Sequence, residues 1–193
     1  MPHERNEQQG RPRARSLALA GAWVAAGLTA VCGGGGGPAR GQAPSPPQVL
    51  TGAALRSMSP AQLDALYRGA GPGNQPRGRV HGLPIVAPGT AFGPRLSRAA
   101  RLVWQGKVFR DDGASAVNQF FGARVIRGNL YQGTSWLDGR PALVLDYQGT
   151  SLVYGRYRDE IREVAPGLYL GLMYARTRDV PRFSRYFAFE TRP

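Results

Sequence analysis

The residues best suited to acid–base chemistry lie in the stretch YRDEIREV, residues 157–164, which carries five charges. If this stretch is a strand, Asp159 and Glu163 share a face and lie about 13 Å apart. The paired carboxylates of a glycosidase lie roughly 5 to 9.5 Å apart, so these two cannot form such a pair. Asp146 belongs to another strand and could approach either of them. An enzyme that uses Asp146 or Asp159 as a general base on a lipid-like or aromatic substrate therefore stays open as an alternative.

The other face of the same stretch has a structural interpretation. Arg158, Glu160 and Arg162 alternate along it and are expected to form an exposed or rim ladder of charges. A short helix, ended by the proline that follows, is the second interpretation of the stretch. In either case these charges are expected to lie on the protein surface and to have no role in catalysis.

Asp159 is the charge in this stretch that we expect to have a specific partner. It shares a face with Ile161, which is expected to pack inward. A buried carboxylate needs hydrogen-bond donors. We expect an arginine of a neighbouring strand, or the hydroxyl of Tyr147 or Tyr154, to donate to it.

The residue types elsewhere argue against several catalytic classes. His81 is the only histidine after residue 43, and Cys32 is the only cysteine of the chain. Histidine-rich and cysteine metal sites and a Ser-His-Asp triad are therefore nearly excluded. No glycine-rich loop follows a strand and opens a helix, as nucleotide-binding motifs require. We expect no metal and no cofactor, and we favour a protein without catalysis.

Residues 1–43 have the layout of a secretory signal peptide followed by a flexible linker. Arg11, Arg13 and Arg15 directly precede residues 16–31, an uncharged apolar stretch. This stretch is short for a membrane span, which needs about 20 apolar residues. We expect export to the periplasm or the medium after cleavage. Lipid attachment at Cys32 is the less favoured alternative, because Val31 stands where that signal requires a small residue.

The formal net charge of +13 permits an anionic partner. However, Lys107 is the only lysine, and so strong a preference for arginine indicates a coding bias. No basic run interleaved with aromatic residues forms a nucleic-acid module, so we expect no specific nucleic acid. A solvated basic surface is the favoured interpretation. Peripheral contact with anionic envelope components is the alternative, and it predicts arginines concentrated on one face.

Residues 44–100 are expected to hold a helix and a lead-in that is rich in glycine and proline. Ser59 suits a helix N-cap, Pro60 the first helical position, and Gln62 closes a capping box. The residues before this helix form a second, weaker helix candidate. From residue 70 to 95, glycine and proline predict an ordered but irregular segment.

Residues 101–193 alternate short β-rich runs with turn residues. The gaps between these runs leave no room for crossover helices, so the strands should pair antiparallel. The pattern fits a small closed antiparallel barrel of the lipocalin type, with a β-sandwich as the runner-up. Residues 44–193 would then form one domain.

Two of these runs show which faces are apolar. The run at residues 168–174 is apolar on both faces and needs an outer cover, for which the helix at residues 60–68 is the candidate. In the last run, strict alternation places Phe183, Phe187 and Phe189 on one face together with Arg185.

A resemblance to a known family begins at residues 103–109, VWQGKVF. Trp104, Gly106, Lys107 and Phe109 resemble the W-x-G-K-x-F element of small bacterial proteins named for a G-x-W-x-G motif, although the first glycine of that motif is missing. That family is accompanied by a domain of unknown function, whose closing pattern is similar to the last strands here. The matching positions are Asp159, Arg162, Val164, Leu170, Gly171, Met173 and Phe187. The resemblance implies a lipocalin-like β-barrel of unsettled function and no catalytic residues.

These observations together predict an exported, monomeric barrel that binds a small apolar or amphipathic molecule. The expected ligand-binding residues are Trp104, Lys107, Asp146, Tyr154, Asp159, Arg162 and Tyr169. Trp104 beside Gly106 indicates a packed aromatic next to a bulge. Because a bulge resets the alternation, Lys107 has two possible positions, inside the barrel or at its rim, and the rim is the favoured one.

Overall fold

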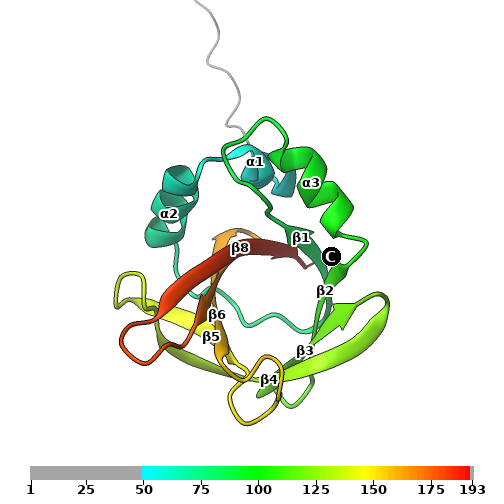
Figure 1. The fold of residues 1–193 in the computed structure, drawn as a ribbon, viewed down its shortest axis with the longest axis vertical. Coiled ribbons are helices and arrows are strands. Elements are labelled where there is room, and N and C mark those ends of the chain that lie inside the picture. The colour runs from blue at the N-terminus through cyan, green and yellow to red at the C-terminus, as the bar shows by residue number, and fades with distance from the viewer. Residues whose placement is uncertain (1–48, 192–193) are drawn as a thin grey trace, which may run out of the picture. The chain divides into compact units, whose positions relative to one another are not determined.

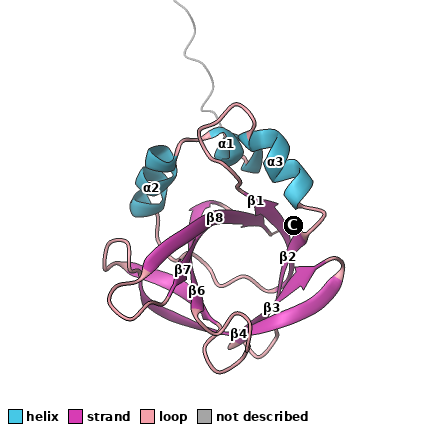
Figure 2. Ribbon diagram, in the orientation of Figure 1, coloured by secondary structure: helices cyan, strands magenta, loops and turns pink. Residues whose placement is uncertain are grey.

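The computed structural model describes residues 49–191 (Figures 1 and 2). The predicted leader, Cys32 and the linker lie outside the described residues. The elements, in order, are α1 (Gly52–Ser57), α2 (Pro60–Gly69), β1 (Gly78–Pro84), α3 (Gly93–Ala100), β2 (Trp104–Phe109), β3 (Ser115–Phe120), β4 (Ala123–Thr134), β5 (Pro141–Asp146), β6 (Tyr157–Ala165), β7 (Leu168–Ala175) and β8 (Arg182–Glu190).

The strands form a closed barrel in which each strand pairs antiparallel with its neighbour in sequence. The last strand returns to the first, with His81 of β1 opposite Glu190 of β8 and Pro84 opposite Phe187. Closure leaves no free sheet edge. The predicted antiparallel barrel is confirmed, and the sandwich alternative is wrong.

The barrel begins earlier in the chain than residue 101. β1 lies inside the segment that was expected to be irregular, and α3 begins near the end of that segment. Glycine and proline hid a short strand in which Val80 is buried in the barrel interior and Leu83 in an outer cluster. β1 is indispensable to the topology, because it is the strand that closes the ring.

The two N-terminal helices form as their capping residues predict. The Thr51 side chain caps α1, and Ser59 forms a capping box with Gln62 at the start of α2. Leu63 and Tyr67 of α2 pack on the outer face of β7 through Leu170 and its neighbours. The expected helical cover for a strand that is apolar on both faces is therefore confirmed. None of the helices within residues 49–191 is long and apolar enough to span a bilayer.

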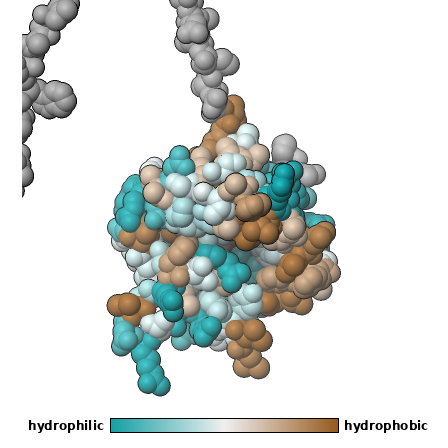
Figure 3. All heavy atoms as spheres, turned by 45° about the horizontal axis from the view of Figure 1, so that its top comes forward, coloured by the Kyte–Doolittle hydropathy of each residue, from teal (hydrophilic) through white to brown (hydrophobic). Residues whose placement is uncertain are grey.

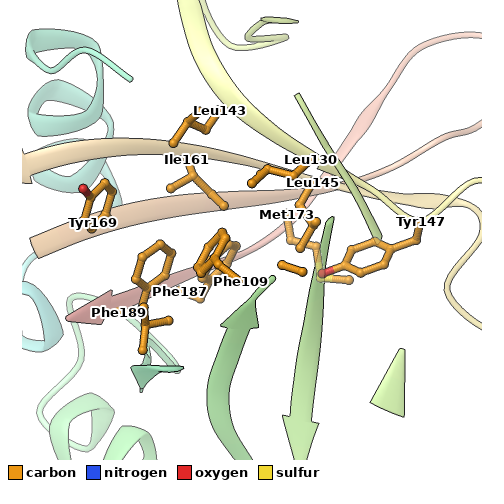
Figure 4. Packing of buried hydrophobic residues seen from close by; sticks show 12 residues of the cluster. Phe109, Leu130, Leu143, Leu145, Tyr147, Ile161, Tyr169, Met173, Phe187 and Phe189 are labelled. Atoms are coloured by element: carbon orange, nitrogen blue, oxygen red, sulfur yellow. The ribbon is translucent and has the colours of Figure 1, made fainter. Parts of the chain in front are cut away.

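The barrel interior is largely filled by its own side chains. Phe109, Leu145, Ile161 and Phe189 are among the buried residues of this inner cluster. Figure 4 shows Tyr169 and Tyr147 at opposite sides of this row of side chains, with the Tyr147 hydroxyl directed inward toward the neighbourhood of Met173. The inward position expected of Ile161 is confirmed.

The two ends of the barrel differ. At one end, the segment from α2 to β1 crosses the opening (Figure 1). The Tyr169 hydroxyl donates to the Asn74 carbonyl at 2.7 Å, and the Gln75 side chain donates to the Gly113 carbonyl at 2.6 Å. These contacts tie the segment to β7 and to the β2–β3 turn, so it covers this closed end.

The opposite end, called the open end below, is surrounded by four connections. They are residues 85–103 between β1 and β2, 121–122 between β3 and β4, 147–156 between β5 and β6, and 176–181 between β7 and β8. No crossing segment within residues 49–191 is pinned across this end as the α2–β1 segment is across the other.

Candidate ligand-binding site

A pocket of about 250 Å³ lies inside the barrel at the open end. Its walls are mainly apolar and aromatic, and come from the β1–β2 connection and from β2, β3, β7 and β8. The principal wall residues are Ile85, Trp104, Phe120, Met173 and Phe187. An apolar concave site with few polar groups is the usual form of a small-molecule site.

A bulge in β2 brings two of the predicted residues into this pocket. The pairing of β2 with β3 shifts register between Trp104 and Gly106. Gly106 has a φ of +129°, and a Cβ atom there would lie 2.3 Å from the Val80 carbonyl oxygen. Because of this shift, both Trp104 and Lys107 face inward although they are three residues apart. The predicted bulge is confirmed, whereas the rim position favoured for Lys107 is wrong.

The floor of the pocket is a buried polar cluster around Lys107. Its Nζ donates to Asp159 Oδ2 at 2.7 Å, to Asn118 Oδ1 at 2.9 Å and to the Tyr147 hydroxyl at 3.0 Å. Tyr147 donates in turn to Asp159 Oδ2 at 2.6 Å, and Asn118 Nδ2 donates to the Tyr147 oxygen at 2.8 Å. The specific partner expected for Asp159 is therefore confirmed as Tyr147, and the cation beside it is a lysine.

This cluster satisfies itself. All three ammonium donors of Lys107 are used, and one carboxylate balances its charge. Burial lowers the pKa of Lys107, which the charge of Asp159 opposes in part. Burial raises the pKa of Tyr147 well above its ordinary value, and the charge of Asp159 raises it further. Tyr147 is thus protonated at neutral pH and able to donate to the carboxylate.

The hydrogen-bonding groups that are free to meet a ligand lie on the pocket lining at the open end. Arg185 is exposed, lines the pocket, and makes no hydrogen bond or ion pair with any described residue. Tyr154 also lines the pocket, its hydroxyl makes no hydrogen bond with a described residue, and burial raises its pKa. The pocket therefore combines a saturated floor, apolar walls and a cationic mouth.

Four of the seven predicted site residues come together in this pocket: Trp104, Lys107, Tyr154 and Asp159. Their role in binding stays a prediction. The other three, Asp146, Arg162 and Tyr169, do not line it.

Each of these three residues has a structural partner elsewhere. Asp146 is paired with Arg176 and accepts from the Tyr131 hydroxyl, because the alternation of β5 sends it outward, opposite to Leu145. Tyr169 lies at the closed end and stacks on Phe189. Asp146 is therefore not in a position to act as a general base in the pocket.

The expected exposed ladder on β6 is wrong. Arg158 is 8% exposed, and Glu160 and Arg162 are 0% exposed. These residues do point away from the barrel interior, but α2 and the β4–β5 connection cover that face. The Ser135 hydroxyl and the Trp136 amide donate to Glu160 at 2.6 and 2.9 Å.

Arg162 has an equally complete set of partners. It forms a two-bond pair with Asp138 at 2.8 Å for each bond and donates to the Tyr67 carbonyl of α2 at 3.0 Å. Its guanidinium also lies over the Tyr67 ring. Arg162 thus joins the barrel to its helical cover and is not free for a ligand.

Asn118 and Arg185 are two polar pocket residues that the predicted site does not include. A signal for Asn118 was present, because the alternation of SAVNQF places this amide on one face with Ala116 and Phe120. Arg185 had been placed on the same face as Phe187, but nothing local marked that face as a pocket wall.

Comparisons with known proteins add no function. No family model matches the chain, and no curated protein matches it. A solved structure, the crystal structure of a protein from Thermomonospora curvata, is 18% identical with a TM-score of 0.47, covering 71% of this chain and 90% of that one. A likeness at this level carries no argument about fold or function. The resemblance to the G-x-W-x-G proteins stays a prediction.

Proposed function

We propose that the barrel binds one small amphipathic molecule, with its apolar part against the pocket walls and an anionic or other hydrogen-bond-accepting group at the open end. The observation that carries this proposal is the contrast between the saturated Lys107 cluster and the free Arg185 at the mouth. A polar ligand group would find its complement at the mouth and not at the floor.

The apolar part of the ligand would supply most of the affinity. Trp104, Met173 and Phe187 offer surfaces that exclude water from a bound ring or short acyl chain. Burying about 150 Å² of apolar ligand surface contributes about 4 kcal/mol before the entropic cost of association. A pocket of about 250 Å³ lies below the common range of roughly 300–1,000 Å³ for drug-sized ligands, which favours a small molecule.

The charge balance favours an anionic head group. Asp159 neutralises Lys107, whereas Arg185 adds a positive charge that no carboxylate within residues 49–191 pairs with. A carboxylate, sulfonate or phosphate at the mouth would form a charge-assisted hydrogen bond with Arg185. A cation at the same position would be repelled.

The proposal is tested by titrating the full chain with 2-naphthoate and with its neutral counterpart, 2-naphthamide, by calorimetry. We expect both to bind and the carboxylate to bind more tightly. Arg185→Gln should weaken 2-naphthoate by about tenfold and leave 2-naphthamide unchanged. The matched control is Arg182→Gln, an exposed arginine of the same strand that does not line the pocket.

Failure to bind either compound at about millimolar concentration would contradict the proposed pocket. Equal losses in the Arg185 and Arg182 variants would contradict the assignment of the head group to Arg185.

A second candidate is an enzyme in which Asp159 removes a proton from a bound carbonyl compound, since Asp159 lies at the pocket floor beside Lys107 and Tyr147. The probe is 2-acetonaphthone in D₂O. Asp159 would take a methyl proton, the electron pair would pass to the enolate oxygen, and solvent deuterium would return to carbon. Exchange in the NMR spectrum that is no faster than with folded Asp159→Asn would exclude this reaction.

We also propose export, on the strength of the basic, apolar and small-residue order of residues 1–43. N-terminal sequencing of protein from the producing cells tests it. An intact N-terminus on protein confined to the cytoplasm would contradict export.

A further inference from the structure

Exposed apolar side chains gather at the open end of the barrel. The most exposed are Leu152 at 107%, Val153 and Leu102 at 77%, Phe121 at 76% and Val180 at 68%. They come from all four connections that surround the pocket mouth. Among the large hydrophobic residues exposed within residues 49–191, all but Val49 and Tyr131 lie in these connections or within about three residues of them.

Single exposed apolar residues are ordinary on a protein surface. A set of exposed apolar residues that lies at one end of a barrel, on four separate connections, is unusual. Figure 3 shows brown hydrophobic groups that project from one face of the molecule, with teal hydrophilic groups near them. These apolar residues come from four separate connections, whereas a rigid protein partner packs closely on one continuous patch.

The exposed charges at the open end are almost all positive. Eight exposed arginines lie in the four connections or on the strand residues next to them. They are Arg95, Arg98, Arg101, Arg124, Arg156, Arg178, Arg182 and Arg185. Asp179 is the only exposed acidic residue among the described residues of that region. Arginines are also present elsewhere, but there Asp111 and Asp112 are exposed as well.

Apolar tips interleaved with basic side chains are the combination that binds the interface of an anionic bilayer. The apolar tips enter the boundary between head groups and acyl chains, while the guanidinium groups pair with lipid phosphates. We propose that the open end docks on an anionic lipid bilayer, with Phe121, Leu152 and Val153 inserted and the surrounding arginines over the head groups.

Docking in this orientation turns the pocket mouth toward the bilayer. An amphipathic molecule could then pass between bilayer and pocket without crossing water. This consequence rests on the proposed ligand binding, whereas docking itself rests only on the surface of the open end.

The test is sedimentation of the full chain with vesicles of phosphatidylcholine, with and without about 30% phosphatidylglycerol. We expect binding to the anionic vesicles only, and release in about 0.5 M salt. The double variant Leu152→Ser/Val153→Ser should bind at least about tenfold more weakly. The matched control is Tyr131→Ser, which removes an exposed apolar residue from the side of the barrel.

A second pair of variants tests the charges. Arg178→Gln/Arg182→Gln should weaken binding to anionic vesicles by at least about tenfold. Arg77→Gln/Arg79→Gln removes two exposed arginines that lie at the closed end and on β1, and should leave binding unchanged. Thermal melts establish that all variants are folded.

Binding that is equal for neutral and anionic vesicles, or equal in the open-end and control variants, would overturn the proposal. So would a chain that binds no vesicle and forms a dimer that Leu152→Ser/Val153→Ser dissociates, because the open end would then be a protein interface. The naphthoate titration is done without vesicles, so a failure of docking and a failure of ligand binding are distinguishable.

Discussion

Lys107 and Asp159 are 2% and 3% exposed, so an ion pair lies almost entirely out of water in the middle of an apolar barrel. Transferring two charges out of water is costly, and the pair is tolerable only because Asn118 and Tyr147 satisfy its remaining donors and acceptors. The Lys107 ammonium also lies 4.9 Å from the centre of the Phe187 ring. Together these contacts lock the side chains that form the pocket floor.

Removing one member of this pair should therefore cost far more than removing both. We predict that Lys107→Met lowers the free energy of unfolding by about 3–5 kcal/mol, because it leaves a buried carboxylate without its cation. The double variant Lys107→Met/Asp159→Leu should recover most of that loss. Urea denaturation measures both. A double variant as unstable as the single one would show that the cluster contributes more than charge balance.

Glu160 is the residue for which the structure most changes the effect on stability that the sequence predicts. As part of an exposed ladder, its removal would change stability by at most about 0.5 kcal/mol. Buried against Ser135, Trp136 and Arg158, it should instead cost about 3–5 kcal/mol in Glu160→Ala, since two donors and a cation lose their acceptor. Thermal melts decide between the two values, with the exposed Asp179→Ala as the control.

The period-two pattern of β6 predicted the direction of each side chain but not its surroundings. Ile161 and Asp159 do point inward, and Arg162 does point outward. Whether a side chain that points outward is exposed to solvent depends on residues far away in the chain. Tyr67 and Asp138 cover Arg162, and the β6 sequence alone does not predict these contacts.

At the scale of whole elements, bulges decide which residues reach the pocket. The register shift in β2 brings Lys107 inside the barrel. A second shift, between Met173 and Tyr174 where β7 pairs with β8, changes which residues of β8 face inward. Strict alternation had placed Phe183 on the face of Phe187, but Phe183 packs on Tyr174 and Tyr186 outside the barrel. Most strands were predictable from sequence, with β1 as an exception, whereas the phase of each strand after a bulge was not.

Gly171 of β7 tests how tightly the strands shape the pocket. A Cβ atom at this position would lie 2.1 Å from the Phe187 ring, which forms a pocket wall. We predict that Gly171→Ala costs about 1–3 kcal/mol and also weakens 2-naphthoate binding, since the ring must move. Gly69→Ala in α2 is the control, because nothing lies within 4 Å of its Cβ position. A variant that lost stability but bound normally would place the strain away from the pocket.

At the scale of the whole molecule, the two ends of the barrel differ: the closed end is covered by the chain itself, and the open end is available for contact with other molecules. The closed end is covered by the α2–β1 segment, and the outer face of β6 and β7 is covered by helices and the β4–β5 connection. The open end keeps the pocket mouth, the free arginine and the exposed apolar tips. The sequence predicted the barrel and its outer helix from local patterns. The difference between the two ends arises from contacts between segments that are distant in the chain, so local sequence patterns did not predict it.

The ion pair between Arg162 of β6 and Asp138 of the β4–β5 connection is sensitive to acid. Arg162 holds the pKa of Asp138 below its ordinary value of 3.8 by hydrogen bonding. A carboxyl group whose pKa is lower in the folded than in the unfolded chain stabilises the fold above the unfolded pKa, and that contribution is lost as the pH falls through the folded pKa. We therefore predict that stability falls with pH below about 4 and that Asp138→Asn flattens this fall.

The measurement is the urea midpoint of the full chain and of Asp138→Asn at a series of pH values between about 2 and 7. At neutral pH the variant should be the less stable, because Arg162 loses its charged partner while remaining buried. The two midpoints should approach each other as Asp138 becomes protonated in the parent protein. Parallel curves over the whole series would mean that the acid sensitivity of the fold lies in other carboxylates.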